Sequence, residues 1–185
     1  MNMKKEILLF IVFSLWFNVV NAQSDDHFAR NYNVKIGQPC PEVAFGLTDG
    51  RTIKISDYTK NTVLIYFWSD AKDTSVKILP ELMRLQKKYG RFEVIAVNDG
   101  KMNVDSLEKF AFEKKLKFPM ALDNNQFLYK TLAGGNKYGY PFGVLIDKEG
   151  NVEKINTNYK EVEKILEGNN VLLKLKNKID KRHKK

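Results

Sequence analysis

The sequence predicts a single α/β domain in which helices flank a central mixed β-sheet. The continuous apolar run at residues 63–68 has the composition of a strand that is buried on both faces, and residues 92–97 form a second buried strand. Segments whose apolar residues have helical spacing follow both predicted strands. Strands that alternate with helices indicate parallel pairing, and a turn signal at residues 147–150 between two further strands indicates an antiparallel edge.

Length and composition are those of one globular domain. The chain has 185 residues, of which 43% are hydrophobic and 12% aromatic. A chain of this length buries a sizeable core without the help of disulfides. It contains one cysteine, Cys40, so a disulfide-stapled fold and any catalytic cycle that needs two cysteines in one chain are excluded.

The N-terminus has the pattern of a secretory signal peptide. Lys4 and Lys5 precede an apolar stretch at 7–17, and Val20-Asn21-Ala22 offers a cleavage site before Gln23. The alternative is a membrane anchor, but the apolar stretch is shorter than the roughly 20 residues that a spanning helix needs. We therefore expect residues 1–22 to be removed and the mature chain to be periplasmic or secreted.

The elements of the first half are predicted from turn residues and spacing. After a flexible lead at 23–35, the Asp49-Gly50 pair predicts a β-hairpin between strands at 43–48 and 51–56. The buried strand at 61–68 is followed by a helix whose apolar residues line one face. Those residues are Ile78, Leu82, Leu85 and Tyr89.

The second half continues the alternation and closes with a hairpin. A strand at 92–97 precedes a second amphipathic helix, which is marked by Leu107, Phe110, Ala111 and Lys114. The remaining strands are expected at 118–122, 142–146 and 152–155. A short helix at 126–132 stops at Gly134-Gly135. A last helix runs from 159 to 167 and either ends at Gly168 or resumes beyond it.

The basic charge of the chain is concentrated at its C-terminus. The formal net charge is +9, and residues 174–185 contain seven Lys or Arg against one Asp. We expect residues 169–185 to form a basic helix or tail that is either solvated or in contact with an anionic membrane surface. No nucleic-acid-binding motif accompanies this tail, so nucleic acid is not an expected partner.

A series of motifs, in order along the chain, resembles one known family. They are Ile36 to Glu42, Asp49-Gly50 with Ile55 to Tyr58, Val63 to Trp68, Pro80, Val94 to Asn98, and Tyr140-Pro141 followed by Phe142 to Asp147 and Gly150. This order resembles the thioredoxin-like redoxins, and among them the TlpA-type periplasmic thiol–disulfide oxidoreductases. The resemblance covers residues 36–168 and implies a thioredoxin-like fold with an added N-terminal hairpin and a cis-proline at Pro141.

The sequence departs from this family where the chemistry is expected. The family has a Cys-x-x-Cys motif after the Phe-Trp pair, whereas this chain has Lys72 and Ser75 in the positions of the two cysteines. Thiol–disulfide exchange needs a thiolate, which a helix N-terminus stabilises. A serine hydroxyl is not ionised there, and a lysine adds a cation at the positive end of the helix dipole. We therefore expect a degenerate redox site, with Asp73 as a helix cap or first-turn acid.

Other chemistries have weaker support in the sequence. We interpret Cys40, between two prolines, as a small buried hydrophobe, with a reactive thiol as the alternative. Asp57, Asp70 and Asp73 have no metal-binding spacing, and Lys72 with Ser75 lacks the other parts of a serine–lysine catalytic site. We expect no metal and no cofactor.

What remains is a scaffold with a binding surface. The family resemblance implies that an extended peptide or protein partner pairs with the loop at Tyr138, Tyr140 and Pro141. Trp68 and Phe142 either extend this surface or belong to the core. Two functions stay open: a redox-inactive binding or scaffolding module, and an atypical thiol–disulfide oxidoreductase that uses Cys40 or the thiols of a partner.

Overall fold

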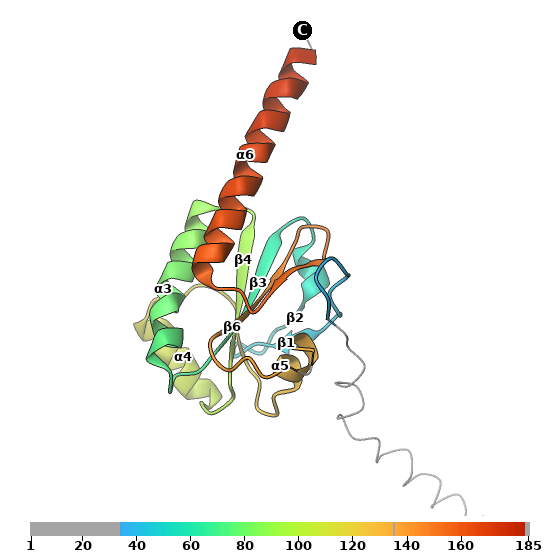
Figure 1. Ribbon diagram of the computed structural model, residues 1–185. Helices are drawn as coiled ribbons and strands as arrows, with labels where there is room; N and C mark the ends of the chain where they lie inside the picture. Colours follow the sequence, from blue (N-terminus) through green and yellow to red (C-terminus); the bar gives the residue numbers. More distant parts are fainter. Residues whose placement is uncertain (1–33, 135, 184–185) are drawn as a thin grey trace, which may run out of the picture.

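The computed structural model describes residues 34–134 and 136–183 (Figure 1). The expected signal peptide, residues 1–22, lies outside the described residues, as does all of the expected lead except Val34 and Lys35.

A five-stranded mixed sheet forms the centre of the domain, as the sequence predicts. Its strand order is β5-β4-β3-β6-β7. β3 pairs in parallel with β4, and β4 with β5, whereas the β3–β6 and β6–β7 pairs are antiparallel. The strands are β3 (Thr62–Trp68), β4 (Phe92–Asn98), β5 (Met120–Leu122), β6 (Phe142–Ile146) and β7 (Val152–Ile155).

Different elements cover the two faces of the sheet, because successive side chains of a strand point to opposite faces. Val63, Ile65 and Phe67 of β3 belong to the core on one face, and Leu64, Tyr66 and Trp68 belong to the core on the other. The first face is covered by β1 (Ala44–Gly46), β2 (Thr52–Lys54) and α5 (Phe127–Leu132); the second by α3 (Asp73–Lys88), α4 (Val104–Glu113) and the first turns of α6 (Tyr159–His183).

Several element boundaries differ from those predicted. The second hairpin strand ends at Lys54, because the Asp57 carboxylate accepts the Lys54 N–H at 2.7 Å and the chain turns into the 3₁₀ helix η1 (Ile55–Tyr58). The expected strand at 118–122 begins only at Met120, after Pro119, which has no N–H to donate to a ladder. α6 runs through Gly168 without a break. In α3, Leu79 rather than Ile78 is fully buried beside Leu82 and Leu85.

Both edges of the sheet are covered by short segments from the N-terminal part of the domain. Leu47 of the hairpin forms a bridge with Ala121 in β5. On the other edge, the Gly37 N–H donates to the Val152 carbonyl at 2.8 Å, and the Cys40 N–H donates to the Gly150 carbonyl at 2.9 Å. Covered edges leave little unpaired backbone for strand addition there.

Candidate functional site

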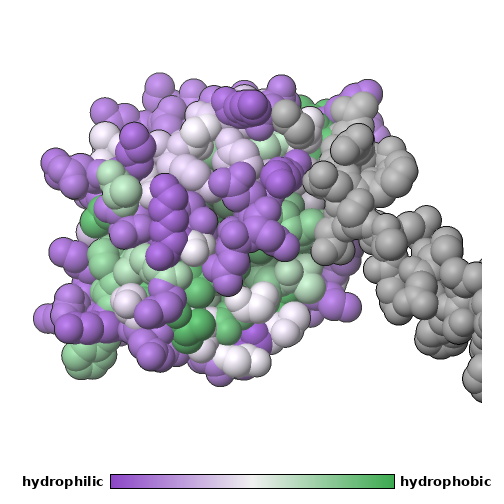
Figure 2. Space-filling view, turned by 90° about the horizontal axis from the view of Figure 1, so that it is seen from below, coloured by the Kyte–Doolittle hydropathy of each residue, from purple (hydrophilic) through white to green (hydrophobic). Residues whose placement is uncertain are grey.

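The sheet register brings the start of α3 next to the loop before β6. Phe67 of β3 pairs with Phe142 of β6, and Trp68 pairs with Asn98 of β4. The segment that leaves β3 at Ser69 therefore lies beside Pro141. Carboxyl ends of parallel strands commonly hold the ligand site of an open α/β sheet. Seen from this end of the molecule, apolar and neutral groups gather between charged side chains (Figure 2).

The first residues of α3 separate a surface cation from a buried hydroxyl. Lys72 is the N-cap residue, with extended backbone and an exposed side chain. Ser75 is fully buried, and its Oγ has no hydrogen-bond partner among the described residues. The Tyr66 hydroxyl donates to the Ser75 carbonyl at 3.0 Å and fixes this turn. Lys72 thus faces solvent, whereas the Ser75 hydroxyl is closed off from it.

A tyrosine from α5 holds the loop before β6. The Tyr140–Pro141 peptide bond is cis. The Tyr129 hydroxyl accepts the backbone N–H groups of Tyr138 and Gly139 at 2.9 and 3.1 Å. One phenol oxygen therefore fixes two successive backbone groups of the loop.

Aromatic side chains of the loop differ in exposure. Tyr138 stacks on Phe142, with 4.8 Å between ring centroids and 6° between ring planes, and is 37% exposed. Tyr140 and Pro141 are half-buried. Trp68 and Phe142 are buried, so they belong to the core rather than to an exposed platform. Of the expected aromatic surface, the structure leaves Tyr138 and the partly exposed Tyr140.

Cys40 lies far from this site. Its backbone pairs with Gly150 in the β6–β7 turn, at the opposite end of β6 from Pro141. Five residues of strand separate the two ends by roughly 15 Å. The Cys40 side chain packs against the core under the hairpin. Burial, and then the charge of Glu42, raise the pKa of the Cys40 thiol to about 12. This is the environment of a structural thiol rather than a reactive one.

Residues 36–155 match the model of the AhpC/TSA family. The chain belongs to this family. It is 31% identical to thiol-disulfide oxidoreductase ResA of Geobacillus thermodenitrificans, over 84% of this chain and 86% of that relative. The resemblance inferred from the motifs is thereby confirmed.

Solved structures confirm the thioredoxin-like fold. A putative protein disulfide isomerase from Bacteroides thetaiotaomicron is 24% identical, with a TM-score of 0.60, over 77% of this chain and 92% of that one. A putative thiol:disulfide interchange protein DsbE from Chlorobium tepidum is 26% identical, with a TM-score of 0.59, over 76% and 97% of the two chains.

In this member of the AhpC/TSA family, three polar residues near the site were not singled out from the sequence. Tyr129 is one, and the others are Asp99 and Asp123, which directly follow β4 and β5. The Asp123 carboxylate accepts the N–H groups of Leu128 and Tyr129 at 3.1 and 2.8 Å and so fixes the start of α5. The position of the two aspartates after buried strands was a usable signal.

These carboxylates and the burial of the loop act on Tyr140. Burial first, and then the charges of Asp99 and Asp123, raise the pKa of the Tyr140 phenol to about 12. Burial also raises the pKa of Asp123, against the opposing effect of the backbone N–H groups that it accepts. The Tyr140 hydroxyl is therefore a neutral hydrogen-bonding group at physiological pH and not a source of phenolate.

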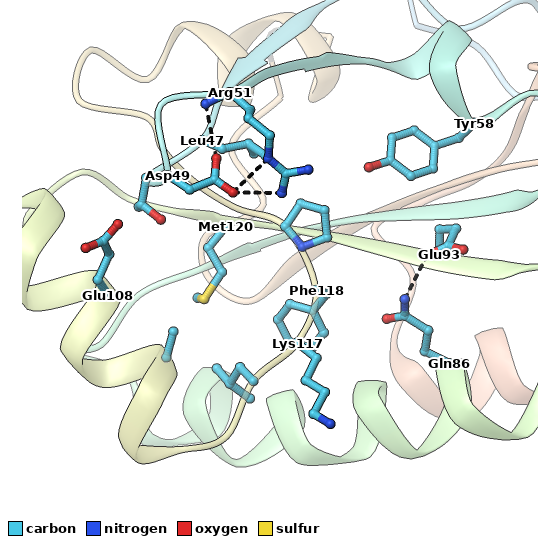
Figure 3. A pocket seen from close by; sticks show the side chains of 14 residues that line it. Leu47, Asp49, Arg51, Tyr58, Gln86, Glu93, Glu108, Lys117, Phe118 and Met120 are labelled. Atoms are coloured by element: carbon cyan, nitrogen blue, oxygen red, sulfur yellow. Dashed lines mark hydrogen bonds and ion pairs between the residues drawn. The ribbon is translucent and has the colours of Figure 1, made fainter.

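A separate hollow of about 410 Å³ lies between the hairpin, α4 and the segment before β5 (Figure 3). Three of its charged side chains have partners within the lining: Arg51 pairs with Asp49 at 2.7 Å, and Glu93 accepts a hydrogen bond from Gln86 at 2.7 Å. Figure 3 shows Glu108 and Lys117 on different walls of the hollow. Because these groups do not converge on one point, the hollow is a weaker candidate than the loop at Pro141.

Proposed function

We propose that this protein is an exported binding module that holds an extended polypeptide at the loop before β6 and carries out no thiol–disulfide exchange of its own. The observation that carries the proposal is the start of α3. An exposed Lys72 and a buried Ser75 occupy the first turn of α3, just after the segment that the sheet register places beside Pro141, and the chain has no cysteine there.

The chemistry of exchange requires two thiols. A thiolate attacks a disulfide, a mixed disulfide forms, and a second thiol resolves it. Neither Lys72 nor Ser75 can form or release a sulfur–sulfur bond. Peroxide reduction fails at the same step, because it needs a low-pKa cysteine in this segment.

The alternative, an atypical oxidoreductase that works through Cys40, has less support. The raised pKa of Cys40 leaves very little thiolate at neutral pH. Its place at the far end of β6 also separates it from the loop at which a polypeptide would bind. Chemistry that uses only the thiols of a partner would need no cysteine in this chain. In that case the role of this chain is again to bind the partner.

The loop has the features of a backbone-pairing surface. Among the described residues, neither the N–H nor the carbonyl of Tyr140 has a backbone hydrogen-bond partner. Tyr129 holds the two preceding residues in place, so little ordering is needed on binding. Main-chain pairing gives affinity without demanding one sequence, and the exposed ring of Tyr138 adds apolar contact.

Activity is tested by insulin reduction with dithiothreitol, for the wild-type protein and for Cys40→Ser. We expect both proteins to give the background rate. The sharper variant is Lys72→Cys with Ser75→Cys, whose sulfurs would sit three residues apart on the first turn of α3, within bridging reach. This variant should form an intramolecular disulfide. Robust turnover by wild type that survives Cys40→Ser would contradict the proposal.

Binding is tested by amide NMR with reduced, carboxymethylated insulin B chain, an extended probe without free thiols. We expect shifts at Gly139 and Tyr140 and weaker binding by Tyr138→Ala. Lys137→Ala, at an adjacent exposed position, is the matched control. Shifts confined to the hollow at Arg51, or none at millimolar probe, would refute the site.

Export is tested by the mature N-terminus. The pattern of residues 1–22 supports cleavage before Gln23. Mass spectrometry of the protein from a periplasmic extract should give a chain that begins at this residue. An uncleaved chain in the cytoplasmic fraction would contradict export.

A further inference from the structure

The last helix, α6, is held by the domain only over its first part. Val162 and Leu166 are buried against the core. The Glu163 carboxylate accepts hydrogen bonds from Arg84 at 3.0 Å and from Lys88 at 3.1 Å, and these bonds hold α6 against α3. Beyond these contacts the helix continues to His183 and projects away from the sheet (Figure 1).

An apolar stripe begins where the helix leaves the domain. It consists of large side chains with high exposed fractions: Val171 56%, Leu172 65% and Leu175 52%. At about 100° per residue these positions fall within one arc of the helix, and the position of Ile179 continues that arc. Over the packed part of α6, the same arc is occupied by polar or small residues, namely Glu161, Lys164 and Gly168. The stripe therefore serves no packing within the domain.

Space at the base of the projection keeps these leucines accessible. A groove of about 760 Å³ separates Leu172 and Leu173 from Arg91, Lys148 and the turn between β6 and β7. Leu173 is 48% exposed although it points along the side of the helix that packs on the domain lower down. The apolar surface is thus open on more than one side.

The charge of this segment selects its partner. Residues 174–185 carry seven basic residues against one acidic residue. By helical spacing, the positions of Lys174 and Lys181 lie beside one edge of the stripe, and that of Lys178 lies next to the position of Val171. Two such helices side by side would place like charges together, which disfavours a second copy of the chain. An anionic lipid surface complements both the charge and the stripe.

We propose that the C-terminal part of α6 is an interfacial anchor that lies on an anionic membrane, with Val171, Leu172 and Leu175 turned toward the acyl chains. Lysine and arginine residues of the same segment would then meet the lipid headgroups. The anchor lies on the membrane rather than through it: within residues 34–134 and 136–183, no helix is apolar enough over a sufficient length to cross a bilayer.

The test uses the full chain with a reporter placed in the stripe. Cys40→Ser removes the native thiol, and Val171→Cys accepts an environment-sensitive NBD label. The matched control carries the label at Phe112→Cys, an 85% exposed apolar position on α4. Vesicles contain either phosphatidylcholine alone or phosphatidylcholine with 30% phosphatidylglycerol.

We expect NBD emission at position 171 to rise at least twofold with the anionic vesicles and to stay unchanged with neutral ones, and the control label to stay unchanged with both. Adding Leu172→Ser and Leu175→Ser should weaken the response at least tenfold. Salt at 0.5 M should weaken it by a similar factor, because it screens the attraction between the basic residues and the anionic headgroups. No response at 171, or equal responses at 171 and 112, would overturn the proposal. A rise with protein concentration in the absence of vesicles would overturn it in favour of a second copy.

Discussion

Native Cys40 is expected to react with iodoacetamide far more slowly than an ordinary thiol. Burial against the core and the charge of Glu42 raise its pKa to about 12. At pH 8, a thiol with this pKa has roughly a thousandfold less thiolate than one with the usual value near 8.5. Because the thiolate is the nucleophile, the alkylation rate should fall by about the same factor.

The assay is the rate of carbamidomethylation at pH 8, followed by mass spectrometry for the native protein and for the protein in 8 M urea. The native rate should continue to rise about tenfold per pH unit up to pH 10, because the fraction of thiolate keeps increasing below the pKa. The urea-unfolded rate should level off near pH 9. A matched positive control is Cys40→Ser with Lys72→Cys, which places one exposed thiol at the start of α3 and should react rapidly. Equal native and unfolded rates at pH 8 would refute the structural role assigned to Cys40.

Four further outcomes follow from the core, the loop and the ion pairs. Leu82→Ala should lower the free energy of unfolding in urea by about 3–5 kcal/mol, because it removes a fully buried side chain; Phe112→Ala, which is exposed, should change it by less than about 0.5 kcal/mol. Tyr129→Phe should cost about 1 kcal/mol and speed amide exchange in the loop before β6, and unchanged exchange would remove Tyr129 from its positioning role. In an absorbance titration at 295 nm, Tyr140→Phe should remove a transition near pH 12. If the variant instead loses a transition near pH 10, the raised pKa of Tyr140 is contradicted. Hydrogen bonds from two basic side chains of α3 lower the pKa of Glu163 to about 2, so its contribution to stability is present above about pH 4.5 and is lost as the pH falls toward 2; Glu163→Gln should abolish that part of the acid titration.

The order of elements could be predicted from the sequence because it depends on local patterns. The continuous apolar run at 63–68 and the largely apolar segment at 92–97 correspond to β3 and β4, and helical spacing located α3 and α4. Boundaries were less certain where a side chain decides them. Asp57 ends β2 by accepting a backbone N–H, and this contact depends on a turn that periodicity does not reveal.

The candidate site also combines features that the sequence predicts with contacts that it does not reveal. Sequence alone predicts that Lys72 and Ser75 stand where the family has a pair of cysteines, since this depends only on residue identity and spacing. It could not show that Tyr129, nine residues before Tyr138, holds the loop before β6 with one oxygen. That contact exists only after α5 packs on the sheet beside β6.

Sequence by itself determined the fold class, the family and the lack of a second thiol, because each is written in residue order and composition. Tertiary structure decided which of those residues are accessible. It buried Trp68 and Phe142, left Tyr138 partly exposed and put Cys40 at the far end of β6. It also showed that the apolar residues after Gly168 stand outside the domain, because the packing of α6 stops one turn before them. Burial is a property of how distant segments meet, and no local pattern contains it.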